Sequence, residues 1–186
     1  MLAGLLLDRD GIVNVDHGYV HRIDQVTFIP GIFDLVREAA RRGMPIAIVT
    51  NQAGIGRGLY TEADFATLTA WMRKRFAEAG APIAAVYHAP EAPAQATPRR
   101  KPGPGMLLEA ARDLGLDLGE SVMLGDRASD MLAALAAGVG HCLLVPAQVA
   151  ERAAAPQGTL ILDSVADAAA WLCARPEPGG VRIAAP

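Results

Sequence analysis

The acidic motif at residues 8–11 constrains this chain more than any other feature. Asp8 and Asp10 follow three leucines at positions 5–7, which are typical of a buried strand, and they precede Gly11. Open α/β sheets carry their ligand sites at the carboxyl ends of the strands. Two acids one residue apart on a strand point to opposite faces, but a turn at Gly11 can bring both to one pocket. One carboxylate can then act as a nucleophile while the other transfers protons, although an acidic turn without a function also fits this motif alone.

Short apolar runs alternate with segments of helical periodicity along most of the chain. We expect strands at residues 3–7, 45–50, 83–87, 121–124, 141–145 and 160–162. We expect helices at 32–42, from 61 onward, at 104–114 and at 129–137. This order predicts an α/β fold, a three-layer α/β/α sandwich with a mainly parallel, Rossmann-like sheet. The connections after Gly11 and Thr50 are too short to contain a large cap domain.

The helix that begins near residue 61 has the clearest local signals. Thr61 suits the N-cap position, and Asp64 stands where a capping acid reaches back to it. The apolar residues that follow at helical spacing predict a stripe that faces the core. They are Phe65, Leu68, Trp71, Met72 and Phe76.

Length and composition indicate one domain. The chain has 186 residues, of which 52% are hydrophobic, enough to bury a core without metal or disulfide bonds. We expect a single domain at residues 1–175 and a flexible tail at 176–186, where proline and glycine are frequent. Cys142 and Cys173 stand in separate apolar contexts without metal-type spacing, so both are expected to be buried, reduced thiols.

The charge pattern narrows the choice of partners. The net charge is −3, the isoelectric point is near 5.8, and no basic stripe interleaved with aromatic residues is present, which argues against nucleic acid. The sequence has neither the pattern of a signal peptide nor that of a membrane span. We therefore expect a cytoplasmic monomer that acts on a small molecule and not at a membrane.

Three further boundaries of predicted elements carry groups that bind ions. Thr50 follows the second predicted strand and offers a hydroxyl next to an amide side chain. Lys101, in a basic cluster before the third helix, supplies a point charge for an anion. Asp126 follows the fourth strand and can join Asp8 and the backbone around Asp10 in an oxygen-rich site suited to Mg²⁺. Taken singly, each group also fits a turn, a solvated loop or a helix cap.

Taken together and in chain order, these elements resemble the haloacid dehalogenase superfamily of phosphohydrolases. The resemblance covers about residues 5–145 and ends with Gly-Asp at 125–126 followed by Asp130. It implies that Asp8 is a nucleophile that forms an aspartyl-phosphate and that Asp10 is a general acid and base. It implies that Thr50 and Lys101 bind phosphate and that Asp130 lies behind the metal ligands. The implied Mg²⁺ site comprises Asp8, Asp10 and Asp126.

A closer resemblance within that superfamily is to the heptose bisphosphate phosphatases, with histidinol phosphatase domains as near relatives. It rests on residues 16–21, 50–58 and 100–102, and Asp-His-Gly-Tyr at 16–19 is the most discriminating stretch. Two cations near the pocket, Arg100 and Arg127, suit a sugar that carries a second phosphate. The substrate-binding residues implied by the resemblance are Asp16, His17, Gly18, Tyr19, Thr50, Asn51, Gln52, Ala53, Arg100, Lys101 and Arg127.

One stretch departs from that family. Its members commonly fold the loop before the Arg-Lys-Pro sequence around zinc with Cys and His ligands, whereas residues 87–98 contain no cysteine and a single histidine, His88. We therefore expect no structural zinc and a loop held by proline stiffness and packing.

The resemblance implies a Mg²⁺-dependent phosphatase that removes the 7-phosphate of D-glycero-D-manno-heptose 1,7-bisphosphate, in the biosynthesis of nucleotide-activated heptose for a surface polysaccharide. One alternative is a phosphatase for histidinol phosphate or another small phosphomonoester. Another is a non-catalytic module that binds phosphosugars. The arginines favour a bisphosphate, and the presence of both Asp8 and Asp10 favours catalysis.

Overall fold

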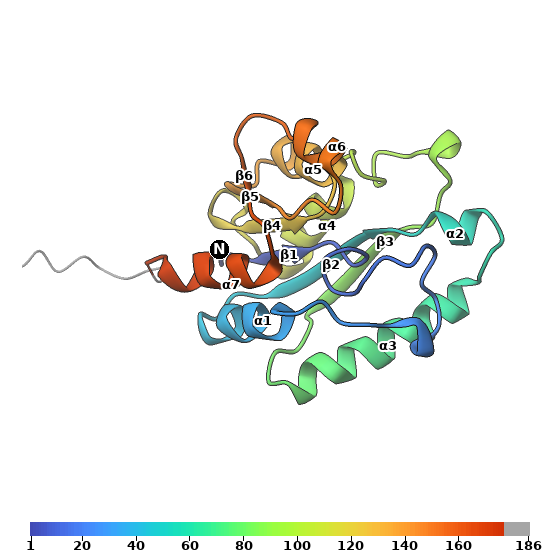
Figure 1. Cartoon of the computed structure of the whole chain (residues 1–186), viewed down its shortest axis with the longest axis horizontal. Coiled ribbons are helices and arrows are strands. Elements are labelled where there is room, and N and C mark those ends of the chain that lie inside the picture. The colour runs from blue at the N-terminus through green and yellow to red at the C-terminus, as the bar shows by residue number, and fades with distance from the viewer. Residues whose placement is uncertain (177–186) are drawn as a thin grey trace, which may run out of the picture.

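Six parallel strands form the centre of the fold in the computed structural model, which describes residues 1–176. They are β1 (Leu5–Leu7), β2 (Ile46–Asn51), β3 (Ala85–Ala89), β4 (Val122–Gly125), β5 (His141–Leu144) and β6 (Thr159–Ile161). Their order in the sheet is β3-β2-β1-β4-β5-β6 (Figure 1). The chain adds β2 and β3 on one side of β1 and then returns to its other side with β4. This reversal opens a crevice at the carboxyl ends of β1 and β4, which is where ligands bind in such sheets.

Helices cover both faces of the sheet, which confirms the predicted α/β/α sandwich (Figure 1). One face is covered by α1 (Ile32–Arg41), α3 (Glu62–Glu78) and α7 (Val165–Ala174). The opposite face is covered by α4 (Gly105–Leu114) and α5 (Ala128–Ala137), with α6 (Val149–Ala153) beside α5. The one-turn helix α2 (Ala53–Gly56) directly follows β2. Short 3-10 turns lie at Ile23–Gln25, Pro93–Gln95 and Leu118–Glu120.

The strand alternation divides the core into two layers. Leu5 and Leu7 of β1 pack with the core residues of α1 and α7, whereas Leu6 faces Met106 and Met131 on the other side. All three leucines are fully buried. Each contributes roughly 1.5–3 kcal/mol to the hydrophobic stabilisation of the fold. Because β1 is central and buried on both faces, the position of the residues that follow it is firmly fixed.

All six predicted strands are present, but the third is displaced. The structure has β3 at Ala85–Ala89 and not at residues 83–87. Pairing with β2 begins where the Ala84 N–H donates to the Ile46 carbonyl at 2.8 Å, so Ile83 is buried in the core without joining the ladder. The predicted start of α3 is confirmed. Thr61 Oγ1 accepts from the Asp64 N–H at 3.1 Å, and Asp64 Oδ2 accepts from the Thr61 N–H at 2.8 Å.

Two features of the C-terminal part differ from the sequence prediction. The helix α7 was not predicted, although Ser164 caps it by accepting from the Asp167 N–H at 3.1 Å. The prediction that both cysteines are buried is wrong for Cys173, which is exposed on α7, and correct for Cys142 of β5. A short alanine-rich helix can turn a cysteine outward, and the periodicity around Cys173 is too weak to say which way it faces.

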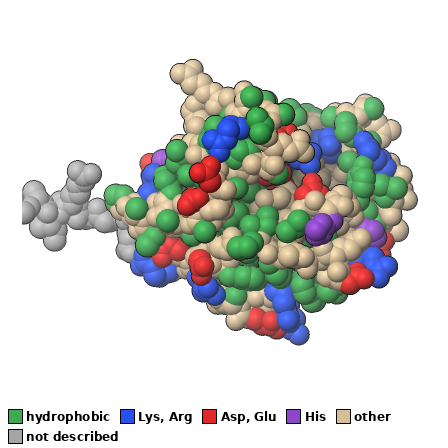
Figure 2. Space-filling view, viewed as in Figure 1, with side chains coloured by type: hydrophobic (Ala, Val, Ile, Leu, Met, Phe, Trp, Pro, Cys, Tyr) green, Lys and Arg blue, Asp and Glu red, His purple; other side chains and the backbone are tan. Residues whose placement is uncertain are grey.

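The remaining predictions on organisation concern the domain limits and the surface. The predicted tail at 176–186 lies outside the described residues, apart from Pro176. Within the described chain, none of the helices has both the length and the apolar character needed to cross a membrane. The loop between β1 and α1 holds no further sheet or large cap. On the face shown in Figure 2, Lys and Arg side chains are scattered among acidic ones and form no continuous stripe.

Candidate active site

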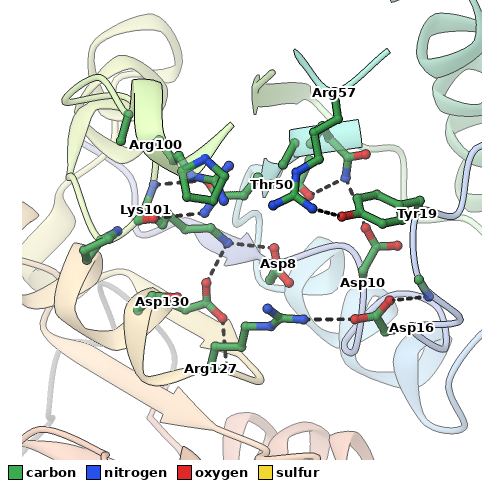
Figure 3. Close-up of a pocket in the computed structure, with 18 of the residues that line it drawn as sticks. Asp8, Asp10, Asp16, Tyr19, Thr50, Arg57, Arg100, Lys101, Arg127 and Asp130 are labelled. Carbon is green, nitrogen blue, oxygen red and sulfur yellow. Dashed lines mark hydrogen bonds and ion pairs between the residues drawn. The ribbon is translucent and has the colours of Figure 1, made fainter. Parts of the chain in front are cut away.

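The turn after β1 brings Asp8 and Asp10 to one pocket. The Asp8 N–H donates to the Leu124 carbonyl of β4 at 2.9 Å, so this residue still belongs to the end of the sheet. Gly11 then turns the chain with a φ of 94°, and a Cβ there would overlap the Asp126 carboxylate. Both Asp8 and Asp10 line the pocket, as the sequence predicts (Figure 3).

Three buried carboxylates form a compact acidic cluster beside this turn. Asp8, Asp126 and Asp130 each offer one oxygen, and these atoms lie within 4.8 Å of one another. Burial raises the pKa of Asp8 to about 7. Burial, reinforced by repulsion from Asp8 and Asp130, raises the pKa of Asp126 to about 8. Asp126 Oδ1 is buried without a hydrogen-bond partner, so the cluster has the size, charge and free oxygen that suit a hard divalent cation.

Asp130 takes a supporting place in this cluster. Its Oδ1 lies 2.7 Å from Lys101 Nζ, and its Oδ2 accepts from the Arg127 N–H at 3.0 Å. Both oxygens are therefore engaged, which is consistent with the predicted place behind the metal ligands. The carboxylate of Asp10 is not part of the cluster, and a contribution from the backbone around Asp10 stays a prediction.

Lys101 is the buried cation that balances the cluster. Its Nζ donates to Asp8 Oδ1 at 2.7 Å and to the Val49 carbonyl at 2.8 Å, in addition to its contact with Asp130. Its side chain is 1% exposed. Burial alone would lower the pKa of Lys101, but the Asp130 and Asp8 carboxylates outweigh burial and raise it. A full positive charge therefore stands beside Asp8, where an anion can be neutralised.

Asp10 is surrounded by donors, of which the sequence analysis names only Gln52, as a substrate-binding residue. Arg9 contacts it at 2.7 Å, and the Asn14 side-chain amide donates to it at 2.9 Å. Gln52 Nε2 reaches Asp10 at 3.1 Å and Thr50 Oγ1 at 2.8 Å, while its oxygen accepts from the Tyr60 hydroxyl. An arginine in a polar turn is usually solvated, so no sequence signal marked Arg9 as buried.

The pocket above these groups has a volume of about 540 Å³ and an arginine-rich rim. Arg127 pairs with Asp16 at 3.0 Å, and Arg100 donates to the Glu91 carbonyl at 2.9 Å. Arg57, on α2's C-terminal side, donates to the Tyr19 hydroxyl across the mouth (Figure 3). Burial lowers the pKa of Arg100, and the positive charges of Arg57 and Arg127 lower it further. Arg57 and Arg127 thus lie close enough to Arg100 to act on its charge, whereas for Arg127 burial alone would lower the pKa but the surrounding carboxylates, Asp126 and Asp16 first among them, raise it.

The pocket gathers nearly all of the predicted substrate residues. Those that line it are Asp16, Gly18, Tyr19, Thr50, Asn51, Gln52, Ala53, Arg100, Lys101 and Arg127. His17 does not line it and is exposed between Asp16 and Gly18. Arg57, Tyr60 and Ser129 also line the pocket and were not predicted. Arg57 lies within residues 50–58, one of the stretches that carry the family resemblance, and this position could have identified it as a pocket residue.

The loop before Lys101 is tied down by hydrogen bonds in addition to its prolines. Thr97 Oγ1 donates to Glu91 Oε1 at 2.8 Å. Arg99 contacts Glu109 of α4 at 2.7 Å and donates to the His88 carbonyl at 2.9 Å. Proline stiffness and packing therefore do not account for this loop alone. The expectation that it holds no zinc stays a prediction.

Comparison with known proteins places the chain in a family. The family model described as HAD-hydrolase-like matches residues 98–168. A Burkholderia mallei protein named D-glycero-alpha-D-manno-heptose-1,7-bisphosphate 7-phosphatase is 46% identical over 164 residues, which cover 84% of this chain and 87% of that protein. An Escherichia coli K12 protein named D-glycero-beta-D-manno-heptose-1,7-bisphosphate 7-phosphatase is 46% identical over 151 residues, which cover 77% of this chain and 79% of that protein.

A solved structure agrees with these sequence comparisons. D,D-heptose 1,7-bisphosphate phosphatase from B. bronchiseptica, complexed with magnesium and phosphate, matches with a TM-score of 0.85 and 29% identity. The match covers 92% of this chain and 98% of that one. Strand order, acidic cluster and sequence similarity thus lead to one conclusion. The chain belongs to the haloacid dehalogenase-like hydrolases and, among them, to the family of the D-glycero-D-manno-heptose-1,7-bisphosphate 7-phosphatases.

Proposed function

We propose that this protein is a Mg²⁺-dependent phosphatase that removes the 7-phosphate of D-glycero-D-manno-heptose 1,7-bisphosphate. The observation that carries the proposal is the placement of Asp8 and Asp10 in a pocket that three arginines also line. Two carboxylates suit attack on a phosphoryl group and proton transfer to its leaving oxygen. The arginines suit a second anionic group on the same substrate.

Asp8 and Asp10 divide the chemistry between them. A carboxylate oxygen of Asp8 attacks the phosphorus of the 7-phosphate, and the bond between this phosphorus and the oxygen on C7 breaks. Asp10 gives its proton to that leaving oxygen, so the sugar departs as an alcohol. Asp10 then accepts a proton from a water molecule whose oxygen attacks the aspartyl-phosphate. Inorganic phosphate leaves, and Asp8 is restored as a carboxylate.

Lys101 and Thr50 receive the transferred phosphoryl group. The Lys101 ammonium already contacts Asp8 at 2.7 Å, so it can offset charge repulsion as a dianion approaches a carboxylate. Thr50 lines the pocket at the end of β2, and its hydroxyl oxygen accepts from Gln52. That bond leaves the Thr50 hydroxyl proton free to donate to a phosphate oxygen.

The acidic cluster fits Mg²⁺. Asp8 and Asp126 would ligate it, because Asp126 Oδ1 is buried without a partner, while Asp130 is occupied by Lys101 and Arg127. When bound, Mg²⁺ neutralises negative charge on the phosphoryl oxygens and so favours attack by a carboxylate.

The arginine-rich rim supports a bisphosphate. One phosphate is served by Lys101 and Thr50, which leaves Arg57, Arg100 and Arg127 for a second anionic group. Arg57 and Arg100 have no carboxylate within ion-pair distance among the described residues, although Arg127 pairs with Asp16. A sugar with one phosphate would leave Arg57 and Arg100 without an anionic partner.

The experiment is a comparison of kcat/KM for both anomers of the heptose 1,7-bisphosphate, for heptose 7-phosphate and for histidinol phosphate, with Mg²⁺ present. Relatives named for the two anomers are equally similar to this chain, so both anomers are assayed. We expect a bisphosphate to exceed the monophosphates by about 10–100-fold, the value of one or two charge-assisted contacts. Equal or faster hydrolysis of histidinol phosphate would favour the second candidate, and tight binding without phosphate release would indicate a binding module.

A further inference from the structure

A buried arginine stands between the two catalytic aspartates and has no part in the mechanism above. Arg9 is 2% exposed and does not line the pocket. A buried ion pair adds little to the free energy of folding, because the cost of removing both charges from water is about as large as the energy of their attraction. The position of Arg9 therefore calls for an account other than stability.

The Arg9 guanidinium donates hydrogen bonds to both oxygens of the Asp10 carboxylate. Arg9 Nε and Nη2 donate to Asp10 Oδ1 at 3.1 and 3.0 Å, and Nη2 also reaches Oδ2 at 2.7 Å. Asn14 adds a third donor to Oδ1 at 2.9 Å. Among the residues that the structure describes, Oδ2 accepts from Arg9 and from Gln52, the latter at 3.1 Å. Oδ1 thus accepts three hydrogen bonds and Oδ2 two, so Oδ2 is the less engaged oxygen and can carry a proton by giving up only the longer bond, from Gln52.

The same guanidinium is anchored to two other segments. Its Nη2 donates to the carbonyl of the fully buried Val20 at 2.6 Å, and its carbon lies 5.8 Å from the centre of the Phe65 ring on α3. Val20 directly follows Tyr19, which lines the pocket. Arg9 therefore joins Asp10 to the loop that carries Tyr19 and to the helix behind that loop.

We propose that Arg9 is a positioning residue for proton transfer: it fixes the Asp10 carboxylate so that Oδ2 faces the leaving oxygen of the substrate. The inference rests on the proposed function, since it needs Asp10 to act as the general acid. A planar guanidinium can contact both oxygens at once, whereas an ammonium at this position reaches one. Loss of the guanidinium should leave the carboxylate in place but held only by the single bonds from Asn14 and Gln52, so its orientation becomes less well fixed.

The test compares two substrates in the variants Arg9→Lys and Arg9→Met. Heptose 1,7-bisphosphate needs protonation of an alkoxide, whereas p-nitrophenyl phosphate has a leaving group that departs without it. We expect Arg9→Lys to lose about 10–100-fold in kcat/KM on the sugar substrate, part of the usual contribution of a general acid, and less than about threefold on p-nitrophenyl phosphate. Arg9→Met should show a larger difference between the losses in kcat/KM on the two substrates.

Arg42→Lys is the matched control. Arg42 is also buried, contacts Glu38 at 2.6 Å and donates to the Cys173 carbonyl, but it lies on the α1 and α7 side of the sheet, away from the pocket. Its replacement should lower the melting temperature and leave the ratio of the two kcat/KM values unchanged. This control separates a general loss of packing from a specific loss of proton transfer.

A double-mutant cycle decides whether Arg9 acts through Asp10. In the Asp10→Asn background, Arg9→Lys should change kcat/KM on the sugar substrate by no more than about twofold, because the group it positions is already lost. Full additivity of the two substitutions, or equal losses on both substrates in Arg9→Lys, would overturn the role of Arg9 while leaving the proposed function intact. Asp10→Asn that loses equally on both substrates would instead contradict Asp10 as general acid, and the role of Arg9 with it.

Discussion

Lys101 Nζ lies 2.7 Å from Asp8 Oδ1, although the two residues stand 93 positions apart in the chain. Asp8 is placed by the end of β1, and Lys101 arrives from the segment before α4. Both side chains are buried, so their attraction is little screened by solvent. The pair brings together the proposed nucleophile and the charge that makes its attack on a dianion feasible.

Lys101→Met should abolish most of the activity. Methionine keeps an unbranched stem but removes the charge next to Asp8, and we expect kcat/KM to fall by about 10²–10³-fold, as for other electrostatic contacts with developing charge. The measurement is initial phosphate release at a temperature where circular dichroism shows a folded variant. Lys74→Met is the control, because Lys74 is exposed on α3 and should retain wild-type rates. A folded Lys101→Met with more than half of the wild-type rate would contradict this role.

Asp126→Ala should raise the requirement for Mg²⁺. Asp126 supplies the buried oxygen without a partner, so its loss removes a ligand and leaves Asp8 to bind the ion with water. We expect the Mg²⁺ concentration for half-maximal activity to rise by about 10–100-fold, and EDTA to abolish wild-type activity. Asp163→Ala, at a highly exposed position, should behave as wild type in the same titration. Full activity in metal-free buffer would refute the metal site.

Arg100→Ala should weaken the use of a bisphosphate more than that of a monophosphate. Arg100 lines the pocket, and its lost charge-assisted contact should cost about 1.5–3 kcal/mol of transition-state binding with the bisphosphate only. The ratio of kcat/KM for heptose 1,7-bisphosphate to that for heptose 7-phosphate measures this difference. Arg112→Ala, exposed on α4, is the control. Equal losses on both substrates would show that Arg100 does not recognise the second phosphate.

Glu38 should make stability depend on pH in the acid range. Hydrogen bonds from Arg41 and Arg42 lower its pKa to about 2, so it stabilises the fold fully above its unfolded value of 4.5 and progressively less as the pH falls towards 2. Glu38→Gln should reduce the free energy of unfolding at pH 7 by ~1–2 kcal/mol. Urea denaturation at pH 7, 4 and 2.5 should show the difference between the two proteins shrinking with acidity. A constant difference would contradict the ion pairs.

The sequence was sufficient for those parts of the site that follow strand ends. Asp8, Thr50 and Asp126 each come directly after a buried apolar run, and parallel strands necessarily bring such residues to one edge. Lys101 could be placed only through the family resemblance, because its contact with Asp8 depends on how a long loop folds back. No local pattern reports that.

Other features were beyond prediction because burial is decided by tertiary packing. The buried guanidinium of Arg9 meets the Val20 carbonyl and the Phe65 ring, which lie 11 and 56 residues further along the chain. The exposure of Cys173 likewise depends on which side of α7 meets α1. The sequence therefore did not predict burial correctly for a charged residue in a turn or for a residue on a helix of weak periodicity.

Phosphorus NMR of the reaction with heptose 1,7-bisphosphate tests the central claim most directly. In the presence of Mg²⁺, the wild-type protein should convert the bisphosphate into heptose 1-phosphate and one equivalent of inorganic phosphate. Asp8→Asn, which keeps the shape of the side chain but not its nucleophilic oxygen, should be at least ~10³-fold slower. Release of the 1-phosphate instead, or an Asp8→Asn variant that hydrolyses the substrate at the wild-type rate, would contradict the account.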